Sequence, residues 1–198
     1  SGAERKKRPS RGGTGILRSE LVNGVLVAER NIVLGLNIPD HPAMKAKAKT
    51  IGLAVGEEQP SFMPFHAWGP DKGSRACPVC KYGRYQGIIY FLGANPNWDE
   101  VKQWLRFLEQ ESAQRAPYLK VYLVYGDDRN YTSGMRDREL AAIGKELGIR
   151  HLALTYVPSY SDTESEAQLN KLENLKGNVF VIYKQRVITD KFIDIQPT

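Results

Sequence analysis

The stretch that decides the fold is residues 87–113, GIIYFLGANPNWDEVKQWLRFLEQESA. It opens with a short apolar run, which is typical of a buried strand. Asn97 then offers a side chain suited to cap a helix, and acidic residues follow it in the first turn. Apolar residues recur at helical spacing in this second half: Trp98, Val101, Trp104, Leu105 and Leu108. The stretch therefore predicts a strand followed by an amphipathic helix.

The same alternation continues toward the C-terminus. Residues 119–126 (LKVYLVYG) predict a second buried strand, residues 135–148 a helix that ends at Gly148, and residues 149–157 a third strand. Because strands and helices alternate, we expect a sheet that is parallel at its centre, with right-handed crossovers.

Two further elements complete the predicted domain. Residues 161–177 (SDTESEAQLNKLENLKG) predict a helix that begins in a cluster of Ser, Asp and Thr and ends at Gly177. Residues 178–195 hold two β-rich runs separated by the polar residues 184–186, which predicts a closing hairpin at the edge of the sheet.

The N-terminal quarter has a different composition. Of the formal charge of +6 on the 198 residues, +5 lies in residues 1–18, which predict a basic disordered tail. Residues 19–50 contain β-branched runs around Asn23-Gly24 and predict a β-rich arm. The main domain is expected over residues 51–198.

Composition excludes several classes of function. No run of about 20 apolar residues exists to cross a bilayer, and the charge in the tail alone does not predict a specific nucleic-acid partner. Phosphate loops, dinucleotide fingerprints and Ser/His/Asp motifs are absent, and no cofactor is expected. The sequence assigns no compartment, since a signal peptide could have been removed.

The order of these elements resembles the thioredoxin fold as it is enlarged in peroxiredoxins, alkyl hydroperoxide reductases and thiol-disulfide reductases. The resemblance covers residue 51 to about residue 195. Residues 55–74 (VGEEQPSFMPFHAWGPDKGS) are similar to the entry of those families, and Cys77-Pro78-Val79-Cys80 looks like the Cys-Pro-x-Cys of glutaredoxins. The resemblance implies an α/β thioredoxin-like fold, in which a central mixed sheet is flanked by helices and preceded by a β-rich N-terminal extension. It also implies redox chemistry at the cysteine pair.

The cysteine pair stands in an atypical place. In thioredoxins it follows the first central strand, whereas Cys77 and Cys80 precede the run at 87–93, and residues 93–98 (GANPNW) fill the usual position. The peroxiredoxin motif Pro-x-x-x-Thr/Ser-x-x-Cys is missing at both cysteines, which argues against peroxidase activity. We expect the pair to lie apart from residues 95–98 unless the connection at 81–86 doubles back.

The local sequence suits thiol chemistry. If Cys77 is the N-cap of a short helix, Pro78 fits the first helical position and the unpaired N–H groups of that turn favour the Cys77 thiolate. Arg75 and Lys81 add positive charge on either side. Cys77 is then the predicted nucleophile, and Cys80, three residues on, is the resolving cysteine.

Other interpretations of the pair remain open. His66 could be brought close by the loop at 69–73 and accept a proton, or be an ordinary packing residue. Two cysteines and three histidines, no two of which stand at a ligand spacing, do not make a zinc site within one chain, although two chains could share one. The pair could also be an inert clip. Asp127 and Asp128, after a strand end, could bind a cation or simply form a turn.

Two functions are consistent with these features. The first is a thioredoxin-like thiol-disulfide oxidoreductase or redox-responsive protein, with Cys77 and Cys80 acting on a protein thiol or disulfide or on a reductase. The second is a non-catalytic binding or scaffold module, in which the N-terminal arm engages a partner or a second copy of the chain. Whether the protein is an enzyme is left open by the sequence.

Overall fold

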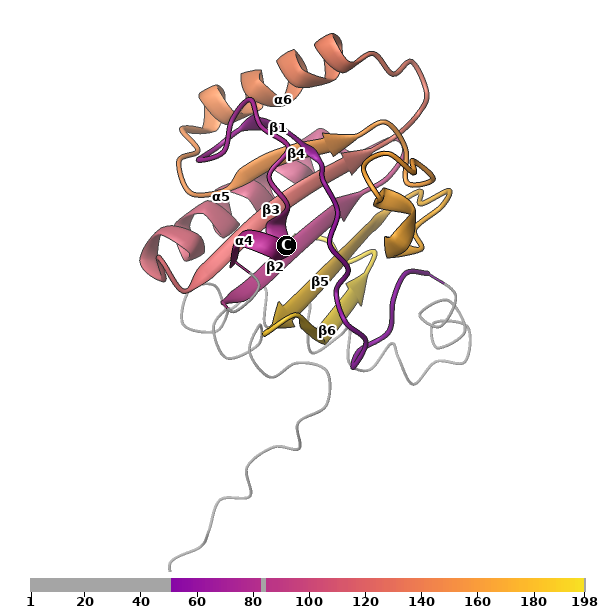
Figure 1. Cartoon of the computed structure of the whole chain (residues 1–198). Helices are drawn as coiled ribbons and strands as arrows, with labels where there is room; N and C mark the ends of the chain where they lie inside the picture. Colours follow the sequence, from indigo (N-terminus) through magenta and orange to yellow (C-terminus); the bar gives the residue numbers. More distant parts are fainter. Residues whose placement is uncertain (1–50, 83–84, 198) are drawn as a thin grey trace, which may run out of the picture.

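The computed structural model describes residues 51–82 and 85–197, and the side chains at 81 and 82 are not described. The predicted tail and β-rich arm therefore lie outside the described residues. Within them, six strands form one mixed sheet in the order β1-β4-β3-β2-β5-β6 (Figure 1). No helix of this part of the chain has the length and apolar character needed to span a membrane.

The centre of the sheet is parallel, as the alternation of strands and helices predicts. Strands β2 (Gln86–Leu92), β3 (Leu119–Gly126) and β4 (Ala153–Val157) pair in parallel. Strand β1 (Phe65–Trp68) adds antiparallel to the free side of β4. The predicted C-terminal hairpin is confirmed as β5 (Asn178–Lys184) and β6 (Val187–Ile193), with β5 antiparallel to β2.

Two long helices cover one face of the sheet, which we call the helical face. Helix α5 (Trp98–Gln114) connects β2 to β3, and α6 (Ser133–Leu147) connects β3 to β4 (Figure 1). Asn97 caps α5 by accepting hydrogen bonds from the N–H groups of Asp99 and Glu100, at 3.2 and 3.3 Å. Four of the predicted apolar positions of α5 are buried and the fifth, Trp98, is partly buried; α6 ends at Gly148 in the left-handed conformation.

Irregular chain covers the other face, which we call the loop face. Its core includes Phe62, the short helix α4 (Pro78–Tyr82) through Val79, and side chains from the segment between β4 and β5. Each of these segments is too short or too irregular to bury a continuous helical stripe. The loop face is nevertheless fully packed, since Phe62 and Val79 have no exposed surface.

The predicted helix at 161–177 is wrong. The segment contains only a short 3₁₀ helix, η2 (Ala167–Asn170), and Glu166, Lys171 and Asn174 have positive φ angles that end a helix. Because β4 and β5 lie on opposite sides of β3 and β2, this segment must cross the loop face. The need to bury side chains along that path competes with helix formation. The Ser, Asp and Thr residues predicted to cap the helix instead form local hydrogen bonds, such as the one from Ser165 Oγ to Asp162 Oδ2.

Glu109 of α5 fixes the turn that leads into β4. Its carboxylate accepts hydrogen bonds from three successive backbone N–H groups, those of Arg150 (2.7 Å), His151 (2.8 Å) and Leu152 (2.9 Å). This turn accounts for the late start of β4, which begins at Ala153 rather than near residue 149. The carboxylate thus ties the C-terminal half of α5 to the end of α6.

We expect Glu109→Gln to lower the free energy of unfolding by about 1–2 kcal/mol, because an amide keeps one acceptor oxygen for three donors. Urea denaturation at neutral pH measures the effect. Glu146→Gln is the matched control: Glu146 forms an exposed ion pair with Lys102 at 3.0 Å, and its loss should cost about 0.5 kcal/mol or less. Equal costs for the two variants would contradict the role of Glu109.

Candidate functional site

The cysteine pair forms a disulfide at the start of helix α4. Cys77 directly precedes the helix, Pro78 occupies its first position, and the Cα atoms of Cys77 and Cys80 are 5.3 Å apart. The backbone N–H of Cys80 donates a hydrogen bond to Cys77 Sγ at 3.1 Å. The structure thus meets the condition on which the predicted thiol chemistry depends: Cys77 precedes a short helix, and one N–H of its first turn contacts the Cys77 sulfur.

The two cysteines differ in exposure. Cys77 is half-buried and packs against the core of the loop face, whereas Cys80 is exposed. Pro78 and Val79, between them, are buried and hold the helix against the sheet. A partner approaching from solvent thus meets Cys80 first.

His66 lies on β1 and is buried, with 1% of its surface exposed. Its Nε2 is 2.8 Å from the carbonyl oxygen of Ala76, the residue before Cys77. Backbone bonds from Gly73 N–H to His66 O and from His66 N–H to Ser74 O fold the predicted loop back onto β1. The loop therefore brings His66 to the backbone that enters the disulfide.

The two cationic residues predicted to flank the cysteine pair are Arg75 and Lys81. The Arg75 guanidinium lies over the ring of Phe65, 4.4 Å from its centroid, and Nη2 donates to Met63 O at 3.4 Å. Arg75 is thus engaged along β1. Lys81 lies within α4, but its side chain is outside the described residues. The roles predicted for both residues stay predictions.

The chain directly after β2 holds no cysteine and is bonded through its backbone to the segment before β5. Directly after β2, the N–H of Gly93 donates to Gly177 O at 2.8 Å and that of Ala94 to Leu175 O at 3.0 Å. A side chain at Gly93 would overlap the carbonyl group of Leu175. The segment before β5 therefore packs against the chain directly after β2, at Gly93 and Ala94.

Three hollows follow the carboxyl ends of the parallel strands, and neither cysteine lines any of them. The cysteines therefore share no hollow with residues 95–98. The pair is also not fully buried, because Cys80 is exposed. The expectation that the pair lies apart from the loop after β2 agrees with these linings. The structure separates the cysteine pair from the polar end of the sheet.

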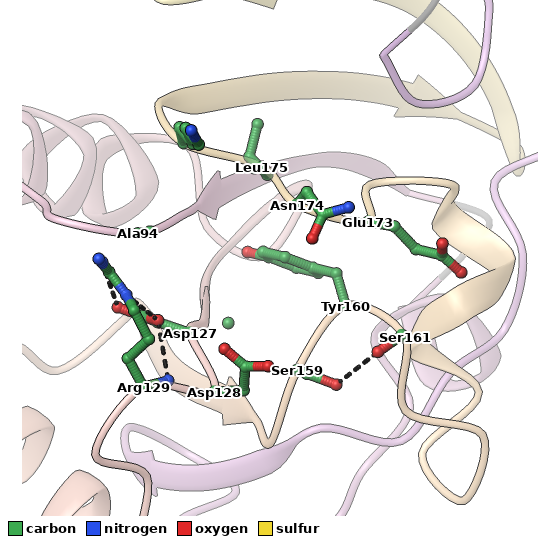
Figure 2. Close-up of a pocket in the computed structure, with 12 residues that line it drawn as sticks. Ala94, Asp127, Asp128, Arg129, Ser159, Tyr160, Ser161, Glu173, Asn174 and Leu175 are labelled. Atoms are coloured by element: carbon green, nitrogen blue, oxygen red, sulfur yellow. Dashed lines mark hydrogen bonds and ion pairs between the residues drawn. The ribbon is translucent and has the colours of Figure 1, made fainter.

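One of these hollows, of about 280 Å³, is shown in Figure 2. Asp127 accepts hydrogen bonds from Nε and Nη2 of Arg129, both at 3.2 Å, and Tyr160 lies with its hydroxyl 2.7 Å from Leu92 O and 2.8 Å from Val124 O. Burial acts to raise the pKa of Asp127, but the hydrogen bonds from Arg129 outweigh it and the pKa is lowered. Tyr160 ties β2 to β3 and is a structural residue here.

The cation site suggested for Asp127 and Asp128 receives no support. Asp127 is occupied by Arg129, and within residues 51–82 and 85–197 no three His, Cys, Asp or Glu side chains are grouped so that they could hold a metal. The sequence pattern marks this strand end but does not point to Arg136, whose guanidinium is buried behind it. An arginine in the first turns of a helix carries no sequence signal that separates it from a surface charge.

Comparisons with known proteins identify the fold. No family model and no curated protein matches the chain. A solved structure titled as a candidate thiol:disulfide interchange protein DsbE from Chlorobium tepidum is 12% identical, with a TM-score of 0.52 over 74% of this chain and 88% of that one. The C-terminal domain of a candidate thiol-disulfide oxidoreductase from Bacteroides thetaiotaomicron is 12% identical, with a TM-score of 0.50 over 70% and 86%. At this identity the likeness shows a thioredoxin-like fold, as the sequence predicts.

Proposed function

We propose that the protein exchanges thiols and disulfides at Cys77 and Cys80. The observation that carries the proposal is the disulfide at the start of α4. Cys80 is exposed to solvent, and the sulfur of Cys77 accepts a hydrogen bond from a backbone N–H. A thioredoxin-like fold agrees with this chemistry but does not by itself require it.

The exchange proceeds in two balanced steps. A partner thiolate attacks Cys80 Sγ, forms a mixed disulfide with Cys80, and breaks the bond to Cys77, which leaves as a thiolate. A second partner thiolate, or the second thiol of the same partner, attacks the partner sulfur of the mixed disulfide. The partner is then oxidised to its disulfide, and Cys80 is released as a thiolate that takes up a proton. The reverse sequence reduces a partner disulfide.

The exposure of the two residues revises their predicted roles. The sequence favours Cys77 as the nucleophile and Cys80 as the resolving cysteine, whereas access favours Cys80 as the sulfur that contacts the partner. Cys77 suits the leaving position, because the N–H of Cys80 stabilises its thiolate and a stabilised thiolate leaves faster. In the reverse direction Cys77 resolves the mixed disulfide.

The partner is a thiol or disulfide that can reach the exposed Cys80. Cys80 lies on a five-residue helix and, among the described residues, borders none of the three hollows, so these hollows do not select a small substrate for it. A protein thiol or disulfide, or a reductase, fits these conditions better than a small molecule that must be enclosed.

Alkylation of the reduced single-cysteine variants tests the proposed asymmetry. In Cys80→Ser the backbone N–H donor is kept, so we expect Cys77 to titrate with an apparent pKa below about 8.5, the reference value for a free thiol. In Cys77→Ser we expect Cys80 to titrate at or above that value. Mass spectrometry of iodoacetamide labelling against pH measures both, and a Cys77 pKa at or above that of Cys80 would contradict the leaving-group role.

The binding-module alternative is favoured by one observation. The carboxyl ends of the parallel strands, where open α/β sheets bind ligands, carry hollows that contain no cysteine. This end of the molecule can therefore bind a ligand independently of the disulfide.

A further inference from the structure

The ring of His66 reaches from the sheet to the chain that enters the disulfide. His66 lies in β1, opposite Thr155 of β4 in the strand register, and is buried. Its Nε2 is 2.8 Å from the carbonyl oxygen of Ala76. Because a carbonyl oxygen can only accept a hydrogen bond, Nε2 carries the proton and donates it. Nε2 therefore serves this loop as a donor rather than as a base.

The Ala76 carbonyl belongs to the peptide unit that places Cys77. Ala76 directly precedes Cys77, and a peptide unit is planar, so the Ala76 carbonyl oxygen and the Cys77 Cα move as one rigid group. A hydrogen bond that holds the oxygen thus restricts the position of the Cys77 Cα. Since His66 is fixed within β1, this bond ties Cys77 to the sheet.

Backbone bonds hold the same loop to β1. The N–H of His66 donates to Ser74 O, and the N–H of Gly73 donates to His66 O, both at 2.9 Å. The N–H of Ala76 donates to Ser74 Oγ at 3.2 Å. The loop is therefore bonded to His66 through both its backbone and its ring, and the ring bond is the one closest in the chain to the disulfide.

Cys80 is held independently of His66. It belongs to α4, which is packed against the sheet through the fully buried Val79. The Cα atoms of Cys77 and Cys80 are 5.3 Å apart in the disulfide. Once the disulfide is reduced, its covalent bond no longer holds the two residues together, and these two anchors keep the thiols near each other.

On the basis of the proposed exchange function, we infer that His66 is a positioning residue that holds Cys77 ready to attack Cys80. In that step the Cys77 thiolate forms the bond to Cys80 Sγ, and the partner sulfur leaves Cys80 as a thiolate. A Cys77 that is already held in place loses less conformational entropy when the ring closes. Loss of the His66 donor should therefore make the disulfide easier to reduce.

The disulfide equilibrium of full-chain variants tests this role. His66→Leu removes the donor, whereas His66→Gln keeps an N–H group on a side chain of similar reach. The chains are equilibrated in mixtures of reduced and oxidised dithiothreitol, and alkylation followed by mass spectrometry measures the fraction of disulfide. We expect His66→Leu to lower the equilibrium constant for disulfide formation about threefold to tenfold, which raises the reduction potential by about 14–30 mV. His66→Gln should stay within about twofold of the wild type.

Thr155→Val is the matched control. Thr155 lies beside His66 on β4, is fully buried, and donates through Oγ1 to Leu123 O at 2.7 Å. The change removes a buried hydrogen bond but keeps the donor to Ala76, so it should lower stability and leave the disulfide equilibrium unchanged. No shift in His66→Leu overturns the inference, as does an equal shift in His66→Leu and either of the other two variants.

Nitrogen NMR of the histidine rings in the wild-type chain adds a test that does not depend on whether a variant folds. We expect Nε2 of His66 to carry a proton in both the oxidised and the reduced chain, and an Nε2 without a proton in either state overturns the inference. An equilibrium constant does not depend on rate. An unshifted constant in His66→Leu therefore counts against the positioning role alone, whereas slow exchange by the wild type counts against the proposed function.

Discussion

Replacing either Cys77 or Cys80 with serine is expected to abolish turnover of a disulfide substrate, with a loss of about 100-fold or more. The reason is that the second step of exchange is intramolecular: the two cysteines lie 5.3 Å apart at their Cα atoms, and no free thiol reaches a comparable effective concentration. Glutathione disulfide is a suitable substrate for the pre-reduced chain, which is oxidised to its disulfide as two glutathione molecules are released, and dithiothreitol, supplied as the reductant, regenerates the dithiol for further turnover. The double serine variant supplies the background rate and shows whether the fold survives without the disulfide.

The single variants should also differ from each other. Because Cys80 is exposed and Cys77 half-buried, reduced Cys77→Ser should accumulate a mixed disulfide with glutathione about tenfold faster than reduced Cys80→Ser. Mass spectrometry of the intact chain resolves the adducts. The chain unfolded in denaturant is the control, because both thiols are then equally accessible and the difference should vanish.

Three outcomes would contradict the proposed exchange. Wild-type turnover by either single variant would show that the pair does not act together. A folded wild-type chain that exchanges no faster than the unfolded chain would identify the disulfide as an inert clip. Faster adduct formation at Cys77 than at Cys80 would restore the roles favoured by the sequence.

Gly144→Ala is expected to lower the free energy of unfolding by about 2–3 kcal/mol, although alanine is the better helix former by about 1 kcal/mol. Gly144 lies in α6 where it meets β1, and an added Cβ would overlap the ring of Trp68, within 2.7 Å of Cδ2. Trp68 cannot easily move aside, because its indole N–H donates to Ile149 O at 2.8 Å. Overpacking at this contact must separate α6 from β1.

Gly134→Ala is the matched control in the same helix. There the nearest neighbour of an added Cβ is Arg138 Nη1 at 3.4 Å, the mobile end of a long side chain. The control should be neutral or stabilising by about 0.5–1 kcal/mol. Thermal unfolding should separate the two variants by about 5–12 °C for a domain of this size. Similar melting temperatures for the two variants would contradict the prediction, because they would show that Trp68 can move away from an added Cβ without lowering the stability of the fold.

The helical face was predictable from local sequence. Strands β2 and β3, helix α5 with its Asn97 cap, and the end of α6 at Gly148 all follow from signals contained within each segment. Apolar periodicity reports which face of an element is buried, and caps report where it ends. The C-terminal hairpin is of the same kind, since two β-rich runs flank polar residues, although the positive φ angles of Gln185 and Arg186 in its turn carry no such signal.

The loop face was not predictable in this way. Residues 161–177 carry a helix-like cap cluster and some apolar periodicity, yet only η2 forms. What determines their path is the distance between β4 and β5 across the sheet, and that distance depends on a strand order that no local pattern encodes. Long-range bonds such as Gln59 Nε2 to Asn170 Oδ1, at 2.7 Å, then fix the segment.

The sequence by itself determined that this chain would build a parallel-centred α/β sheet, because apolar spacing and caps act over a few residues, and it allowed a short helix at the two cysteines. Only the tertiary structure decided that Cys80 is exposed while Cys77 is half-buried, that the backbone after β2 bonds to residues 175–177, and that the Arg136 side chain is buried. Each of these depends on backbone or side chains brought together from distant parts of the chain. Burial and hydrogen-bond satisfaction are properties of that assembly, not of any segment within it.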